Sequence, residues 1–293
     1  MIEPKATSNT FQKIAIFLEM IKFSHTIFAL PFALTGALLA ARGLPTGAQL
    51  FWIIMAMAGA RTAAMGLNRL IDADIDARNP RTAGRAIPAG LIGKGVTLAF
   101  IIASLAVLLV AAARLNPLCL KLAPLAVFFL VLYSYCKRFT SLAHVVLGIC
   151  LAAAPIGAWI AIRGTVDIPA LILGSIVLFW VAGFDILYAL QDLEFDRTAG
   201  LHSIPVALGV GGSLWAARLF HLTMLMLLIW LSTTLHLGAF FMAGICVVVA
   251  MLAYEHWLLR NGDLTKLDAA FFNMNGYISV AILVFTAADV LVR

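Results

Sequence analysis

Apolar segments of about 20 residues follow one another almost from end to end of this chain. Each is long enough to cross the hydrocarbon core of a bilayer as a helix, because an α-helix rises about 1.5 Å per residue. Hydrophobic residues make up 63% of the 293 residues and charged residues only 12%, whereas soluble domains are roughly half apolar. The chain is therefore predicted to be an integral membrane protein.

Counting these runs predicts about nine transmembrane helices in an all-α bundle. Their approximate ranges are 21–41, 49–70, 91–113, 118–136, 142–162, 168–190, 213–235, 238–259 and 270–291. No Pro/Ser-rich linker or low-complexity stretch separates them, so residues 1–293 are expected to form a single integral-membrane domain. Residues 1–20 end in a stretch with charged and apolar side chains at helical spacing and are expected to form an interfacial lead-in.

The formal net charge of +6 comes from basic residues in the short loops between apolar runs. Such a distribution follows the positive-inside rule and does not form a stripe for nucleic acid. The N-terminus and the loops after the second, fourth, sixth and eighth runs are accordingly expected on the cytoplasmic side. A short N-terminus without transit-peptide composition favours a bacterial inner membrane. No obligate protein partner is evident from the sequence.

Half of the acidic residues lie in two short segments, seven of fourteen in the whole chain. Residues four apart share one face of a helix, which predicts two polar ladders. The first ladder contains Asn68, Asp72 and Asp76, and the second contains Asp185, Asp192 and Asp196. Asp74 and Glu194 fall off these faces. If the two ladders face each other, they form a cage of carboxylates.

Unpaired carboxylates this close together repel one another, and burial near lipid adds a desolvation penalty. A hard divalent cation would offset both costs, and Mg²⁺ suits a site in which phosphate oxygens and water complete an octahedron. The sequence therefore predicts Mg²⁺ as cofactor and a diphosphate as substrate. Basic residues near both ladders are expected to clamp the diphosphate: Arg81, Arg85, Lys137 and Arg138. Together they would help an allylic diphosphate ionise, so that an electron-rich ring captures the cation.

Several stretches resemble known motifs in the same order along the chain. Residues 68–76 read NRLIDADID, which is similar to the N-D-x-x-D-x-x-x-D motif of intramembrane aromatic prenyltransferases, with Arg69 where an aspartate is usual. Residues 81–90, RTAGRAIPAG, resemble that family's R-T-x-x-R-P segment. Residues 184–196 match its Y-D-x-x-Y-A-x-x-D and D-x-x-x-D patterns except at Phe184, and 135–138 resemble its Tyr-Lys-Arg segment. The chain is identified as a member of the UbiA superfamily.

This resemblance implies nine transmembrane helices around a central cavity, with both motifs at its cytoplasmic mouth. It also implies Mg²⁺-dependent transfer of a polyprenyl group from its diphosphate to an aromatic acid. The expected catalytic residues are Asp72, Asp76, Asp192 and Asp196. The same four and Asn68 are the expected metal ligands. The expected substrate-binding residues are Asn68, Arg69, Arg81, Arg85, Lys137, Arg138, Asp185, Tyr188 and Arg61.

Arg61 lies seven residues before Asn68, two turns along the same helix face, and is expected to enter the same cavity at greater depth. Residues 61–68, RTAAMGLN, resemble a stretch of the 4-hydroxybenzoate-type branch. Arg61 is therefore expected to bind the carboxylate of the acceptor. The other reading is that Arg61 pairs with a motif aspartate and orders the cavity, because a buried arginine usually has a partner.

Three alternatives to 4-hydroxybenzoate prenylation stay open at this point. One is prenylation of a naphthoate in menaquinone synthesis, which stays open because the first motif has the variant Asn68–Arg69. The second is an ion-coupled transporter, although transporters usually carry their charges near the bilayer midplane. The third is a CDP-alcohol phosphotransferase, whose D-G-x-x-A-R signature is absent from the chain.

Overall fold

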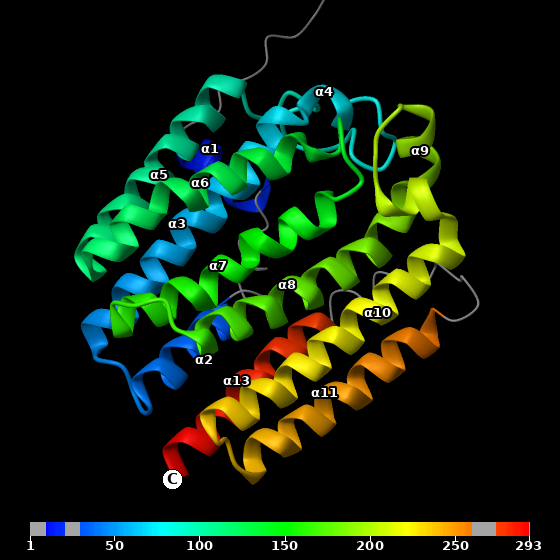
Figure 1. Ribbon diagram of the computed structural model, residues 1–293. Coiled ribbons are helices and arrows are strands. Elements are labelled where there is room, and N and C mark those ends of the chain that lie inside the picture. The colour runs from blue at the N-terminus through cyan, green and yellow to red at the C-terminus, as the bar shows by residue number, and fades with distance from the viewer. Residues whose placement is uncertain (1–9, 21–29, 260–273, 293) are drawn as a thin grey trace, which may run out of the picture.

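The protein is a bundle of long helices that lie roughly side by side (Figure 1). Its structure is a computed structural model that describes residues 10–20, 30–259 and 274–292, and no strand occurs among them. The longer helices are α2 (Leu30–Ala41), α3 (Gly47–Ile71), α5 (Lys94–Leu115), α6 (Pro117–Cys136), α7 (Ala143–Arg163), α8 (Ile168–Ala189), α10 (Ile204–Leu235), α11 (Ala239–Leu258) and α13 (Asn275–Val292).

Eight helices of the described residues are long and apolar enough to cross a membrane, which confirms the predicted membrane bundle. The first predicted span, 21–41, is represented by α2, and residues 21–29 lie outside the described part of the chain. Residues 270–273 of the last predicted span also lie outside it. The other predicted spans correspond one to one with α3, α5, α6, α7, α8, α10 and α11.

The predicted start of the seventh span, residue 213, was wrong by nine residues. Helix α10 begins at Ile204, where the Ser203 side chain accepts a hydrogen bond from the Val206 N–H at 3.2 Å and caps the helix. The small residues of 209–213 lowered the local hydrophobicity and hid this first part of the helix. Gly209 interrupts it with a φ of 66°, a left-handed conformation that glycine adopts without steric cost.

The centre of the bundle is α8, which packs most extensively against α7 and α10. Trp180 of α8 is fully buried and contacts the aromatic rings of Phe32 and Phe184. On the side away from α10 and α11, helix α3 packs against α5. Helix α7 lies between these two groups (Figure 1), and α6 packs against α3, α5 and α7. This arrangement leaves α3, α6, α7 and α8 around a shared interior.

Helix α1 (Thr10–Met20) packs one face against the bundle and leaves apolar side chains exposed on the other. Phe17 is buried and stacks on Phe100 of α5 with 4.4 Å between ring centroids. Phe11 is 80% exposed. An amphipathic helix with large exposed apolar side chains is typical of a membrane interface. The geometry of α1 agrees with the predicted interfacial position of residues 1–20, which stays a prediction.

Close approach of α7 to α8 depends on Gly148. A β-carbon at this position would lie 2.6 Å from the carbonyl oxygen of Leu178 and 3.1 Å from its Cα, both backbone atoms of α8. Small residues let membrane helices approach in this way and gain van der Waals contact. The contact lies one turn from His144, which holds part of the site described below, so it also sets the geometry there.

We expect Gly148→Ala to destabilise the protein by about 1–3 kcal/mol, because the added methyl must push α7 away from α8. The matched control is Gly157→Ala on the same helix, where an added β-carbon meets nothing within 4 Å. Thermal unfolding of both variants in detergent would measure the difference. Equal melting temperatures for the two variants would contradict the packing argument.

Candidate active site

Two short helices lie at the same end of the bundle, and each contains the last carboxylate of one acidic motif. Helix α4 (Ala73–Asp76) follows α3, and helix α9 (Leu193–Thr198) follows α8 through the 3-10 turn Leu190–Asp192 (Figure 1). The residues at the two breaks are Asp72, with φ −90° and ψ 7°, and Asp192, with φ −101° and ψ 4°. The matching backbone supports the view that the two motifs are related halves. We call this end of the bundle the mouth.

The first ladder survives the break in the helix. The Asp72 N–H donates to the Asn68 carbonyl at 3.0 Å, and the Asp76 N–H donates to the Asp72 carbonyl at 2.7 Å. The helical spacing of Asn68, Asp72 and Asp76 is therefore preserved across the break. Asp76 and its counterpart Asp196 are both buried.

A loop after α4 joins the first motif to the second. Within it, Asn79 donates from Nδ2 to Asp192 Oδ1 at 2.9 Å, and Arg81 donates from Nε to the same oxygen at 2.8 Å. The Arg81 Nη2 also bonds Asp192 Oδ2, which makes the contact bidentate. Burial lowers the pKa of Arg81, but the hydrogen bonds and charge of Asp192 outweigh this and hold it above its usual value. Arg81 stays charged and ties the two halves together.

The other ladder carboxylates also have basic partners, which corrects the expectation of unpaired, mutually repelling carboxylates. Arg85 Nη1 lies 2.6 Å from Asp76 Oδ1, Lys137 Nζ lies 3.7 Å from Asp196 Oδ2, and Arg138 Nη2 lies 3.2 Å from Asp72 Oδ1. Arg85 comes from the loop after α4, whereas Lys137 and Arg138 come from the end of α6. Burial raises the pKa of Asp72, and the Arg138 charge opposes that rise.

The two acidic residues off the ladders lie on the surface, as helical spacing predicted. Asp74 has a side chain 88% exposed and pairs with Lys94 at 3.2 Å. Glu194 has a side chain 80% exposed and pairs with Arg197 at 3.5 Å. These carboxylates have no part in the mouth.

Asp185 is held by a residue that the sequence analysis did not select, His144 of α7. Its Nδ1 lies 2.7 Å from Asp185 Oδ2, and its Nε2 accepts a hydrogen bond from the Ile204 N–H at 3.4 Å. Because Nε2 is an acceptor, Nδ1 carries the proton and donates to Asp185. His144 lies 41 residues before Asp185, so helical spacing does not connect the two residues. The signal in the sequence is a histidine within an apolar run, which indicates a polar partner.

Tyr188 lies one turn beyond Asp185 and meets Arg81. The Arg81 Nη1 donates to the Tyr188 hydroxyl at 3.3 Å, and the guanidinium carbon lies 5.5 Å from the ring centroid. A guanidinium over a tyrosine face gains cation–π attraction. The predicted mouth residues of both motifs are thus brought together in one polar cluster.

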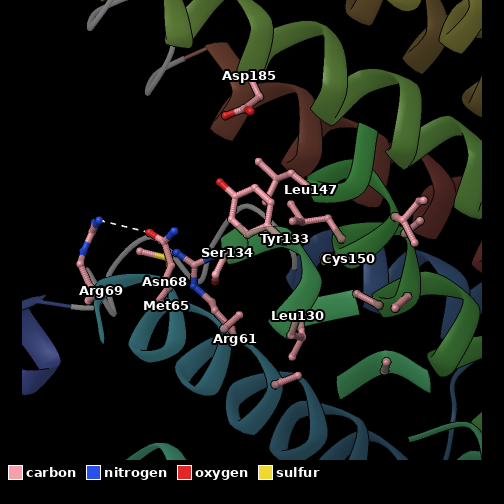
Figure 2. A pocket seen from close by; sticks show the side chains of 18 of the residues that line it. Arg61, Met65, Asn68, Arg69, Leu130, Tyr133, Ser134, Leu147, Cys150 and Asp185 are labelled. Carbon is pink, nitrogen blue, oxygen red and sulfur yellow. Dashed lines mark hydrogen bonds between the residues drawn. The ribbon is translucent and has the colours of Figure 1, made fainter. Parts of the chain in front are cut away.

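A cavity of about 1110 Å³ runs from the mouth into the bundle. Figure 2 shows Arg61, Asn68 and Arg69 of α3 on one wall, facing Tyr133 of α6 and Asp185 of α8. Further from the motifs, α6, α7 and α8 contribute mainly apolar side chains, among them Leu122, Leu130, Leu147, Ile149, Ile156 and Leu178. The cavity is polar at the mouth and apolar in its depth.

Arg61 has no carboxylate partner within 4 Å among the residues that the structure describes. Its Nε is buried without a hydrogen-bond partner, and the side chain lines the cavity. The reading in which Arg61 pairs with a motif aspartate is therefore wrong for this structure. A largely buried cation without a counter-ion is costly, so this position of Arg61 needs an explanation beyond packing.

The chain also matches known proteins. The profile described as the UbiA prenyltransferase family matches residues 29–277. A curated relative from Aliivibrio salmonicida, named 4-hydroxybenzoate octaprenyltransferase, is 28% identical over 286 residues, which cover 97% of this chain and 100% of that protein.

Solved structures have the same fold. The apo structure of a UbiA homolog from Aeropyrum pernix K1 superposes with a TM-score of 0.84 at 33% identity, covering 92% of this chain and 98% of that one. A UbiA homolog from Archaeoglobus fulgidus, bound to DMAPP and Mg²⁺, has a TM-score of 0.71 at 21% identity, covering 94% and 98%. The family match over residues 29–277, together with the paired motifs at the mouth, shows that this chain belongs to the UbiA prenyltransferase family.

Proposed function

We propose that this protein transfers a polyprenyl group from an allylic diphosphate to an aromatic acid, with 4-hydroxybenzoate as the acceptor. The observation that carries the proposal is the meeting of two carboxylate motifs and four basic residues at one end of an otherwise apolar cavity. A diphosphate with a hydrocarbon tail has the same division between a charged head and an apolar body. The relatives named 4-hydroxybenzoate octaprenyltransferase support the choice of acceptor and of a long chain.

The basic residues of the mouth are proposed to bind the diphosphate. Arg81 and Arg138 have side chains that are 33% and 37% exposed, so they can turn N–H donors toward a ligand while keeping their carboxylate partners. The guanidinium group of an arginine binds phosphate oxygens through two parallel hydrogen bonds. Arg85 and Lys137 add two further positive charges beside the motifs. Fixed cations of this kind stabilise the charge that develops on a departing diphosphate.

The donor set fits Mg²⁺. Asp76 Oδ2 of the first motif and Asp196 Oδ2 of the second are buried without a hydrogen-bond partner, and carboxylate oxygens are the ligands that Mg²⁺ prefers. No three His, Cys, Asp or Glu side chains of the described residues form a ready metal cluster, so phosphate oxygens are needed to complete coordination. Mg²⁺, when bound, would help the diphosphate to leave as the C1–O bond breaks. The proposed protein ligands are Asn68, Asp72, Asp76, Asp192 and Asp196.

The acceptor is proposed to lie between the mouth and Arg61. The Arg61 guanidinium offers a counter-charge to the carboxylate of 4-hydroxybenzoate, and the α3 residues next to it in the cavity, Ala60 and Ala64, are small and apolar. Asp185, held by His144, and Tyr188 lie nearer the motifs and are proposed to contact the substrates where ring and prenyl carbon meet. The apolar depth of the cavity would hold the prenyl tail.

An ion-coupled transporter fits the described residues less well. The ion pairs that line the cavity gather at one end of the bundle, around α4 and α9, and do not continue through it. A transport path needs polar groups near the bilayer midplane on both sides of a central site. By the positive-inside rule we further propose a bacterial inner-membrane location with the mouth in the cytoplasm.

The reaction is tested directly with purified protein in nanodiscs, farnesyl diphosphate, Mg²⁺ and an equimolar mixture of 4-hydroxybenzoate and a dihydroxynaphthoate. We expect mass spectrometry to find prenylated 4-hydroxybenzoate, and no product when EDTA removes the metal. Prenylated naphthoate alone would replace the acceptor with that of the menaquinone route. Untouched diphosphate would overturn the proposed reaction.

Asp192→Ala is expected to lower kcat by at least about 100-fold, because it removes a metal ligand and releases Arg81 from its place at the mouth. Asp72→Ala should lower kcat by a similar factor. The matched control is Asp74→Ala, which removes an exposed carboxylate from the same segment as Asp72. Steady-state turnover of the three variants measures these effects. Normal kcat in either ladder variant would contradict the assignment.

Arg61→Ala should raise KM for 4-hydroxybenzoate by roughly 10-fold or more, since a charge-assisted hydrogen bond contributes about 1.5–3 kcal/mol. KM for the prenyl diphosphate should stay the same. Arg114→Ala, which removes an arginine stacked on Trp52, serves as the control for a change of charge alone. An equal rise of both KM values in Arg61→Ala would assign this arginine to general ordering of the cavity.

A further inference from the structure

Arg69 differs from the other basic residues of the mouth in having no carboxylate partner within 4 Å in the described part of the chain. Its side chain lines the cavity beside the first ladder and is 9% exposed. Its Nη1 donates to the Asn68 Oδ1 at 3.4 Å, as Figure 2 shows, while its Nε is buried without a partner. A nine-tenths buried guanidinium with unused donors at this place requires an anion.

No described residue places a carboxylate within 4 Å of the Arg69 side chain, and the two carboxylates of the first ladder each pair with another cation. Asp76 pairs through Oδ1 with Arg85. Asp72 accepts from Arg138 at Oδ1 and from Asn68 Nδ2 at Oδ2, at 3.2 and 2.8 Å. Other cations already pair with the carboxylates of the first ladder. The charge of Arg69 is therefore an additional positive charge at this ladder.

Arg69 also changes what the first motif can offer a metal. Asn68 Oδ1, the oxygen that would ligate a cation, accepts the Arg69 hydrogen bond. A divalent ion at that oxygen would sit within a few ångströms of a buried guanidinium and be repelled by it. The buried oxygen of the first motif that has no hydrogen-bond partner is Asp76 Oδ2, one turn further on.

We propose that Arg69 takes the place of one divalent cation at the first motif and binds the diphosphate directly. The charges agree with this exchange, because an arginine carries the same net charge as an aspartate with one Mg²⁺ bound. The guanidinium also presents paired N–H donors that match phosphate oxygens. Mg²⁺ would then be held at this motif by Asp76 and Asp72, and Asn68 leaves the ligand set proposed above because its Oδ1 accepts from Arg69. This inference rests on the proposed diphosphate chemistry and specifies its metal content.

The test counts bound metal and does not depend on turnover. Mn²⁺ is titrated into the intact protein with saturating inorganic pyrophosphate, and free Mn²⁺ is measured by electron paramagnetic resonance. We expect Arg69→Asp to bind one more Mn²⁺ per protein than the unmodified chain, and Arg69→Lys to bind the same number as the unmodified chain. Arg78→Asp is the matched control, since this exposed arginine lies outside the cavity and bonds the Asp74 carbonyl.

A second measurement covers the case in which Arg69→Asp does not fold. Arg69→Gln should weaken binding of pyrophosphate in EDTA by about tenfold, as expected for loss of one charged hydrogen bond, and Arg78→Gln should leave it unchanged. Equal, non-zero Mn²⁺ counts in the unmodified chain and a folded Arg69→Asp would overturn the role of Arg69 alone. Absence of pyrophosphate-dependent Mn²⁺ binding in both would overturn the proposed metal-diphosphate chemistry as well.

Discussion

The site depends on the contact between Arg81 and Asp192. These residues are 111 positions apart, and their bidentate pairing, with Asn79 on the same carboxylate, fixes the loop after α4 against the end of α8. Without it the two acidic motifs would belong to separate helix ends. With it, the second motif carries a cation from the loop that follows the first, so the two motifs are held close together before any ligand arrives. Preorganisation of this kind lowers the cost of binding a highly charged substrate.

The cost of removing charges from water also explains why the mouth lies at the end of the bundle. A carboxylate–guanidinium pair loses less solvation near the membrane surface than at the midplane. Deeper in the cavity polar groups become few, and Arg61, whose Nε is buried, has no carboxylate partner among the described residues. Helices α7 and α8 line this cavity and approach closely at Gly148, one turn from His144. Charged head and apolar tail are thereby separated along one cavity.

The two halves of the site are similar in backbone and different in chemistry. Asp72 and Asp192 stand at equivalent helix breaks, yet Asn68 and Arg69 precede the first while Asp185 precedes the second. His144 donates to Asp185 and leaves it a hydrogen-bonded carboxylate, whereas Arg69 brings a positive charge to the opposite wall. The asymmetry suits a site in which one half binds phosphate through protein cations and the other presents carboxylates.

The sequence by itself determined the membrane bundle, the two ladders and the surface position of Asp74 and Glu194. Hydrophobic length and helical periodicity are local properties, so they could be read without knowing how the helices pack. Only the tertiary structure decided that the ladder carboxylates are paired, that His144 meets Asp185, and that Arg61 and Arg69 lack carboxylate partners among the described residues. Each of these depends on which helix ends come together. Close packing between distant segments, such as α7 on α8, determines which helix ends meet. Such packing leaves no periodic pattern in the sequence.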